Sequence, residues 1–257
     1  ERGEPSRFKI VSTWHSYHGS TLGALAASGR ERPRASFQPY FSGAWPHIAS
    51  AYCYRCPFGL RCDTCGVQCA QELERVILHE GPENIAAFVL EPVVGTTTGG
   101  THPPAEYFAI VRDTCDKYGI LLIADEVMSG FGRTGERFAV DHWNLVPDII
   151  ACGKGLGSGY APIFATLLHG RIVETLRSGS ARIGLGHTYN GNPLSCAVGS
   201  AVLDYIEQHD LVDRAKVLGQ LLRTELEGLR KIPYVGDVRG LGLRQGIELV
   251  ADTRTRQ

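Results

Sequence analysis

The chain has 257 residues, of which 43% are hydrophobic and 21% charged, and its formal net charge at pH 7 is -1. This length suits one large globular domain plus part of another. The 26 Lys and Arg residues balance the 27 Asp and Glu residues without long blocks of one sign, so the charge supports neither a nucleic-acid partner nor an acidic membrane surface. No apolar run is long enough to span a bilayer, and the opening ERGEPSRFK does not resemble a signal peptide. We therefore expect a cytoplasmic protein that acts on small molecules.

The amino-terminal part predicts a strand, FKIVST (8–13), and a helix of small residues, TLGALAAS (21–28). The opening residues read as the end of a helix, and there is no initiator methionine, so we expect a piece of a longer chain. Residues 30–69 are rich in Pro, Gly and aromatic residues and show little periodicity. Long ordered loops in compact domains tend to be functional, so this segment is a candidate functional loop.

This loop contains the run YCYRCPFGLRCDTCGVQC, with Cys53-x-x-Cys56, then Cys62-x-x-Cys65, then Cys69. Paired Cys-x-x-Cys units are typical of zinc and iron–sulfur sites, because four thiolates brought together by short turns suit a tetrahedral metal. Only five residues separate the two pairs, which is short for a zinc ribbon, and a cytosolic protein would not normally hold disulfides there. We therefore favour free or opportunistically bound thiols over a metal site. The other cysteines read as small buried apolar residues: Cys115, Cys152 and Cys196.

The middle of the chain alternates between helix and strand. CAQELERVILHEG (69–81) and AEYFAIVRDTCDKYG (105–119) predict amphipathic helices that end at glycines, and IAAFVLEPV (85–93) predicts a buried strand. This alternation implies right-handed crossovers and a three-layer α/β domain around a mostly parallel sheet. Glu91 closes the buried strand before Pro92, and the residues alone favour a structural and a functional role for it equally.

Residues 120–157 contain two short apolar runs, LLIA and DIIAC, that each deliver one charged residue. Asp125 closes the first run and Lys154 follows the second. Such runs are typical of parallel strands buried on both faces, and ligands bind beyond the carboxyl ends of these strands. We therefore expect the acid and the lysine to meet in one cleft. Gly155 follows the lysine in place of Ser or Thr, so the segment is not a phosphate-binding P-loop.

The last third predicts a strand in PIFATLLHG (162–170), a long helical stretch (194–231) interrupted near residues 208–210, and two strands in VGDVRGLGLRQGIELV (235–250). We expect a large domain over residues 1–205, and a linker helix with the start of a small α+β domain over residues 206–257. Between the strand and the helices lies the string GHTYNGNP, whose Thr188 could cap a turn or donate to a phosphate.

The strings ADEV, FGRTG and PDIIACGKGLG, preceded by Tyr17-His18-Gly19-Ser20-Thr21, resemble the active-site core of the class III aminotransferases, which are pyridoxal-phosphate enzymes of fold type I. The resemblance covers essentially all 257 residues but not the whole family fold. It implies that an amino-terminal glycine-serine loop, which holds the cofactor phosphate, and a carboxyl-terminal part with a substrate-binding arginine are missing.

On this resemblance, pyridoxal 5'-phosphate is the cofactor and two residues are catalytic. Lys154 is the Schiff-base lysine and general base, and Asp125 keeps the pyridine nitrogen protonated. Tyr17 matches the aromatic residue that lies flat on the cofactor ring, with His18 beside it. The resemblance also implies a cofactor contact for Val127, a place on the substrate side for Glu91, and a contact from Thr188 to the cofactor phosphate of the neighbouring subunit. The active sites would then be shared within a homodimer.

The implied activity is transfer of an amino group between an amine or ω-amino acid and a 2-oxo acid such as pyruvate or 2-oxoglutarate. An aminomutase, an epimerase or a decarboxylating transaminase remains open, because these enzymes use the same cofactor in the same fold. A non-catalytic metal-binding protein built on Cys53, Cys56, Cys62 and Cys65 remains open as well.

Overall fold

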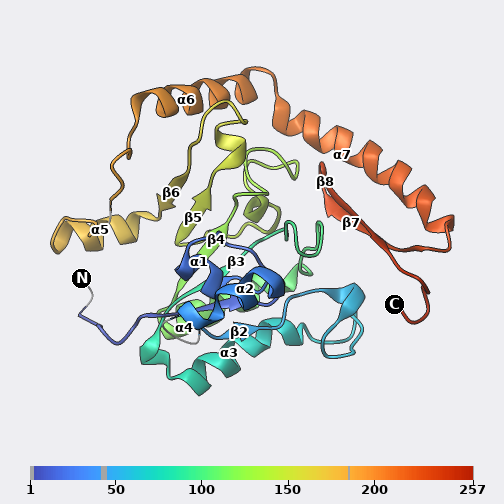
Figure 1. Ribbon diagram of the computed structural model, residues 1–257, viewed down its shortest axis with the longest axis horizontal. Coiled ribbons are helices and arrows are strands. Elements are labelled where there is room, and N and C mark those ends of the chain that lie inside the picture. The colour runs from blue at the N-terminus through green and yellow to red at the C-terminus, as the bar shows by residue number, and fades with distance from the viewer. Residues whose placement is uncertain (1–2, 42–44, 185, 257) are drawn as a thin grey trace.

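The structure is a computed structural model and describes residues 3–41, 45–184 and 186–256 (Figure 1). Its centre is a six-stranded sheet in the order β2-β1-β3-β4-β5-β6, and β7 and β8 form a separate two-stranded sheet. The first five strands pair in parallel, and only the edge strand β6 is antiparallel to its neighbour. The predicted mostly parallel sheet is therefore confirmed. The strands are β1 (Lys9–Thr13), β2 (His47–Ile48), β3 (Ile85–Leu90), β4 (Leu121–Asp125), β5 (Ile149–Cys152), β6 (Ala165–Leu168), β7 (Val235–Leu241) and β8 (Arg244–Leu249).

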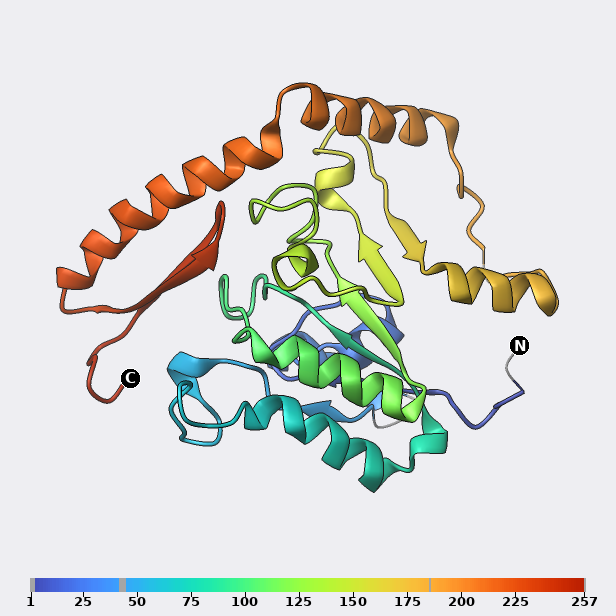
Figure 2. The ribbon, with the colours of Figure 1, turned by 180° about the vertical axis from the view of Figure 1, so that it is seen from behind.

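Helices cover both faces of this sheet, which gives the predicted three layers. Figure 2 shows α3 and α4 in front of the sheet with α1 and α2 behind it, and α6 and α7 arch over the upper end of the molecule. The α-helices are α1 (Leu22–Ala27), α2 (Glu31–Phe37), α3 (Gln68–Glu80), α4 (Glu106–Tyr118), α5 (Gly170–Ser178), α6 (Pro193–Gln208) and α7 (Leu211–Glu227). The short 3₁₀ turns are η1 (Gln38–Tyr40), η2 (Cys53–Arg55), η3 (Pro82–Asn84), η4 (Ala139–Trp143), η5 (Lys154–Leu156) and η6 (Gly228–Lys231).

The main core lies between the sheet and helices α3 and α4. The α4 helix buries Tyr107, Phe108, Val111 and Cys115, a spacing that places these side chains on one helical face. Phe108 packs against Trp143, with 4.4 Å between the ring centroids. The helix ends as its sequence predicts, with a glycine in the left-handed conformation whose N–H donates to the last carbonyls.

Asp148 lies just before β5 and fixes that strand in the domain. It is 3% exposed, and one of its oxygens accepts a hydrogen bond of 2.8 Å from the N–H of Leu122 in β4. Its carboxylate also pairs with Arg112 of α4 and Arg171 of α5. Burial alone would raise the pKa of Asp148, but the Leu122 amide and the two guanidinium groups outweigh it and lower the pKa. One carboxylate thus joins two strands and two helices.

Replacing Asp148 by alanine should lower the free energy of unfolding by about 3 kcal/mol, near the low end for a broken buried ion pair, because Arg171 is half exposed. The lowered pKa means that this contribution is complete above the ordinary carboxyl pKa and is lost only as the pH falls through the folded-state value. The difference in the free energy of unfolding between wild type and Asp148→Ala, measured with urea, should therefore stay constant between about pH 5 and 8. Glu174→Ala, which breaks an exposed pair with Arg177, is the control and should change nothing measurable.

Three expectations about local structure are wrong. Residues 30–69 contain α2 and β2, which the absence of periodicity did not predict. The α2 helix buries none of its residues and therefore has no apolar stripe, and β2 is two residues long and exists only through its pairing with β1. The opening residues 3–8 form turns and extended backbone rather than the end of a helix. Finally, β3 ends at Leu90, so Glu91 stands just outside the strand.

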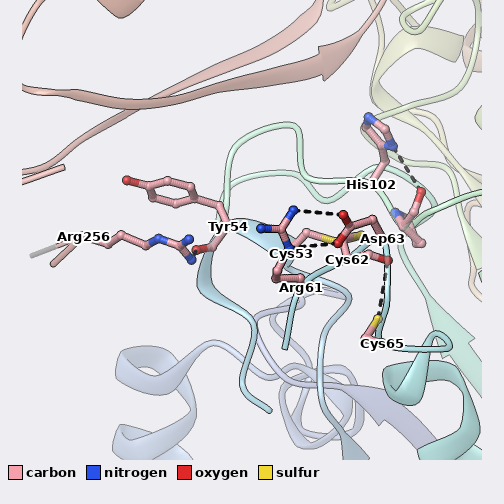
Figure 3. The surroundings of a disulfide bond; sticks show 9 residues. Cys53, Tyr54, Arg61, Cys62, Asp63, Cys65, His102 and Arg256 are labelled. Carbon is pink, nitrogen blue, oxygen red and sulfur yellow. Dashed lines mark hydrogen bonds and ion pairs between the residues drawn. A yellow bond between two sulfur atoms is a disulfide. The ribbon is translucent and has the colours of Figure 1, made fainter. Parts of the chain in front are cut away.

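The cysteine loop also differs from expectation, because the structure joins Cys53 and Cys62 in a disulfide (Figure 3). The free thiols of the loop are therefore Cys56, Cys65 and Cys69. Among the described residues there is no group of three or more His, Cys, Asp or Glu side chains that could hold a metal ion.

The remaining cysteines agree with expectation in two cases. Cys115 and Cys152 are buried. Cys196 is exposed, as are most residues of α6, in which only Gly199 is buried. No helix in the described ranges is both long enough and apolar enough to cross a membrane.

Candidate active site

Asp125 and Lys154 lie at the same edge of the central sheet. Asp125 is the last residue of β4 and is in register with Ala151 of β5, and Lys154 follows β5 two residues after its end. The two strands are parallel, so their carboxyl ends meet at one edge. Parallel pairing thus delivers an acid and an amine to the same place.

The Asp125 carboxylate is 8% exposed and both of its oxygens are hydrogen bonded. Oδ2 lies 2.8 Å from Nδ1 of His18, and Oδ1 accepts from the N–H of Val127 at 3.1 Å. His18 is itself held, since its backbone N–H donates to the hydroxyl of Ser28. The other ring nitrogen of His18, Nε2, is buried without a partner in the described part of the chain. The carboxylate is therefore fixed in orientation before any ligand binds.

Lys154 has a backbone conformation that is unusual for its residue type. Its φ is +42°, in the left-handed region that disfavours residues with a Cβ. Its Nζ lies 2.6 Å from Sδ of Met128, in the loop after β4. The turn is tight, because a Cβ added to Gly155 would lie 3.2 Å from the Phe131 side chain. Strained residues of this kind persist where surrounding packing fixes them, and they cluster at functional sites.

Glu91 is buried and binds two backbone amides. Oε1 accepts from the N–H of Tyr17 at 2.8 Å, and Oε2 accepts from the N–H of Gly95 at 2.7 Å. Burial raises the pKa of Glu91, and the nearby negative charge of Asp125 acts in the same direction, while His18 and the two amides oppose it. The contacts give Glu91 a structural function: it ties the segment after β1 to the loop after β3.

Two of the other predicted site residues lie near this edge and one does not. Tyr17 is half-buried, and its hydroxyl lies 2.8 Å from Oγ of Ser20. Val127 lines the cleft described below. Thr188 is exposed in the connection between α5 and α6 and does not line that cleft.

A cleft of about 570 Å³ opens beside Lys154, between the loop after β4, the last turn of α6, α7 and the start of β8. Its size is typical of a small-molecule site. The residues of its wall that bear on its chemistry are Val127, Met128, Arg133, Lys154, Arg214 and Arg244. Another cavity, of about 590 Å³, lies among Arg7, Cys115 and Arg171. It contains neither Asp125 nor Lys154.

Met128 and the three arginines of the cleft were not predicted as site residues from the sequence. Met128 stands three residues after Asp125, and only the fold brings it against the Lys154 amine. Arg244 could have been noticed as a charged residue inside a predicted strand. Nothing in the sequence relates it to residues more than 80 positions earlier.

A comparison with known families fits this arrangement. The family model for aminotransferase class III matches residues 1–257. The chain belongs to the class III aminotransferase family. It is 41% identical over 256 residues to a probable aminotransferase of Mycobacterium tuberculosis, an alignment that covers 99% of this chain and 54% of the relative.

Solved structures of omega-transaminases share the fold. An (S)-enantioselective omega-transaminase from Thermomicrobium roseum superposes with a TM-score of 0.93 at 39% identity, covering 100% of this chain and 56% of that one. An omega-transaminase from Pseudomonas jessenii in complex with PMP gives a TM-score of 0.93 at 36% identity. The superposition covers 99% of this chain and 56% of that one. The α/β fold is thus that of the fold type I large domain. The chain spans about half the length of these relatives.

A test of the Glu91 contacts is substitution by glutamine, which keeps the shape but has only one accepting oxygen. Either the Tyr17 or the Gly95 amide would then face an NH₂ group, and a buried donor without an acceptor costs about 1–3 kcal/mol. We expect Glu91→Gln to lower the free energy of unfolding, measured with urea, by about this amount. The exposed Glu207→Gln in α6 is the matched control, and an equal effect of both variants would contradict this interpretation.

Proposed function

We propose that the protein is an aminotransferase that binds pyridoxal 5'-phosphate through Lys154 and moves an amino group between an amine or ω-amino acid and a 2-oxo acid. The observation that carries this proposal is the placement of Asp125 and Lys154 at the ends of the paired strands β4 and β5, with His18 holding the carboxylate. Membership of the class III family supports it, since these aminotransferases use pyridoxal phosphate.

The residues present fit this cofactor. A pyridine nitrogen that must stay protonated needs a fixed, buried negative charge, and Asp125 has that character. The aldehyde needs an amine within a cleft of suitable size, and Lys154 lines one of about 570 Å³. His18 also has a buried ring nitrogen, Nε2, without a partner in the described ranges, so its ring can stabilise a neighbouring polar group.

When bound, the cofactor supplies an electron sink that stabilises negative charge on the substrate carbon. Asp125 would hold the proton on the pyridine nitrogen by its charge, and His18 and the Val127 amide keep the carboxylate from turning away. Lys154 would hold the cofactor, and its free amine would serve as the general base that removes the proton from the substrate carbon. Tyr17 and Val127 would flank the cofactor ring.

We also propose a homodimer in which Thr188 donates to the cofactor phosphate of the partner subunit. Two observations support this arrangement. Thr188 is exposed rather than turned toward the cleft of its own chain. The neighbouring helix α6 is largely apolar, yet it exposes Leu194, Leu203 and Tyr205, as a helix that packs against a second chain would. The separate pairing of β7 with β8 supports a division into a large domain over residues 1–205 and a smaller one from residue 206 onward.

The names of the relatives favour amino transfer over the other reactions of this cofactor. Two of the most similar solved structures are omega-transaminases, and curated relatives 38% identical to this chain are adenosylmethionine-8-amino-7-oxononanoate aminotransferases. An amine or ω-amino donor is therefore the substrate class that we propose, with a 2-oxo acid such as pyruvate or 2-oxoglutarate as acceptor.

The cofactor attachment has a direct test. Borohydride treatment of the full-length protein loaded with cofactor, followed by mass spectrometry, should place a stable adduct on the peptide that contains Lys154. Lys117 and Lys216 serve as internal controls, because both form ion pairs with glutamates at the surface. An adduct on either of them would contradict the assignment.

The function of Asp125 has a separate test. Asp125→Asn keeps the size and can still contact His18, but a neutral amide does not hold the pyridine proton. We expect kcat to fall on the order of a thousandfold while the far-ultraviolet circular dichroism and the Lys154 adduct are retained. Asp213→Asn, at an exposed position in the first turn of α7, is the control. Activity of Asp125→Asn within a few-fold of the control would rule out the role.

A further inference from the structure

Arg244 brings a guanidinium group into the cleft from the C-terminal hairpin. It is the first residue of β8, and it lines the cleft together with Lys154 and Met128. Its side chain is partly buried, and its Nε is buried without a hydrogen-bond partner among the described residues. No ion pair to Arg244 is formed within residues 3–41, 45–184 and 186–256. Burial lowers the pKa of this arginine, so the charge is held under desolvation with no compensating bond.

The position of Arg244 relative to Lys154 follows from Gly95 and Met128. A Cβ built on Gly95 would lie 3.2 Å from Nη2 of Arg244 and 3.1 Å from Cγ of Met128, so both side chains reach the same glycine. The sulfur of Met128 lies 2.6 Å from Nζ of Lys154. Met128 therefore lies near both the guanidinium and the amine, and a ligand that contacts Met128 could reach both.

Glu91 is an acid close to this guanidinium, but each of its oxygens already accepts a backbone amide. The same Gly95 Cβ would lie 2.9 Å from Oε2 of Glu91, so Glu91 and Arg244 are neighbours. Both oxygens of Glu91 accept backbone amides, and the structure has no ion pair between the two side chains in the part that it describes. The negative charge of Glu91 opposes the lowering of the Arg244 pKa without neutralising the group.

The charge of the cleft has one sign. Four cationic side chains line it and no Asp or Glu does so among the described residues. The cations are Arg133, Lys154, Arg214 and Arg244. A guanidinium group matches the two oxygens of a carboxylate, and in a desolvated site this pairing is among the stronger hydrogen-bonded interactions. Arg133, Lys154 and Arg214 are exposed, so water solvates them, whereas the partly buried guanidinium of Arg244 would gain a partner from an acid and not from a neutral amine.

The hairpin that carries Arg244 is held firmly against the large sheet's loops. The guanidinium of Arg239 on β7 donates to the carbonyl oxygens of Thr98 and Gly99. On β8, the Glu248 carboxylate accepts from Tyr52 and Arg55 of the cysteine loop. Arg244 is thus presented to the cleft by a fixed strand, and a carboxylate bound there would be held at a defined distance from Lys154.

We propose that Arg244 binds a carboxylate of the substrate, at the far end from the amino or oxo carbon at which Lys154 acts as general base. The inference rests on the proposed function and names the substrate class: an ω-amino acid or 2-oxo dicarboxylic acid, rather than a neutral amine, uses this subsite. A phosphate is also an anion, so the guanidinium could instead hold the cofactor phosphate. The experiment below separates the two sources.

The test uses the full-length protein loaded with cofactor, and glutarate as a dicarboxylate probe that does not react. Calorimetry should show a dissociation constant for glutarate that rises on the order of 10- to 100-fold in Arg244→Leu, as expected for losing a charge-assisted hydrogen-bonded pair. The glutarate dissociation constant of Arg244→Lys should lie between those of wild type and Arg244→Leu. Lysine keeps the positive charge but cannot bind both carboxylate oxygens as a guanidinium does. If Arg244→Leu does not fold, Arg244→Gln gives the same readout. The matched control is Arg223→Leu on α7, which should bind glutarate as wild type does because Arg223 pairs with Glu227 and does not line the cleft.

A second measurement separates the subsite from the cofactor. The dissociation constant of pyridoxal phosphate and the KM of a neutral amine such as 1-phenylethylamine should stay within about twofold of wild type in Arg244→Leu, while the KM of glutamate or 2-oxoglutarate rises. An unchanged glutarate constant overturns the proposal. Weaker binding of pyridoxal phosphate together with unchanged glutarate binding also overturns it, because that result would assign Arg244 to the cofactor phosphate. Glutarate binding needs no turnover, so failure of the proposed aminotransferase reaction, seen as the lack of a Lys154 adduct, is distinguishable from failure of this inference.

Discussion

The parallel pairing of β4 with β5 is the constraint on which the candidate site depends. The register that sets Asp125 opposite Ala151 puts the carboxylate at the edge where β5 gives way to Lys154. Parallel strands end at the same side of a sheet, so a single hydrogen-bonded ladder aligns two residues that are 29 positions apart in the chain. Asp148, at the other end of β5, holds this strand to α4 and α5.

Buried carboxylates organise the loops around this edge. Glu91, Asp125 and Glu126 each accept at least one backbone amide from a loop residue. Glu126 also accepts from the hydroxyl of Ser129 at 2.5 Å, and burial raises its pKa. A buried charge is tolerated only when donors surround it, so each carboxylate fixes the loop that supplies its donors. The same residues that make the site polar therefore make its loops rigid.

The C-terminal hairpin completes the cleft from a distant part of the sequence. Arg239 and Glu248 connect it to the loop after β3 and to the cysteine loop. The disulfide between Cys53 and Cys62 closes the loop that supplies Tyr52 and Arg55 to Glu248 (Figure 3). The cysteine segment, which resembles a metal site in sequence, thus acts in this structure as a support for the strand that carries Arg244.

The sequence by itself determined most of the secondary structure and pointed to Asp125 and Lys154 as the central residues of the candidate site. The apolar runs, the glycines that end α3 and α4, and the strings around Asp125 and Lys154 are local signals, and local patterns of burial and turn chemistry specify local structure. Elements without such a signal, α2 and β2, were missed. The tertiary structure alone decided that His18 holds Asp125, that Glu91 binds two amides, that Cys53 pairs with Cys62, and that Arg244 reaches the cleft. The disulfide forms within one loop, between residues with a sequence separation of 9. The other contacts join elements that the sequence order does not bring together, and the packing of the sheet and the hairpin sets the distances between them.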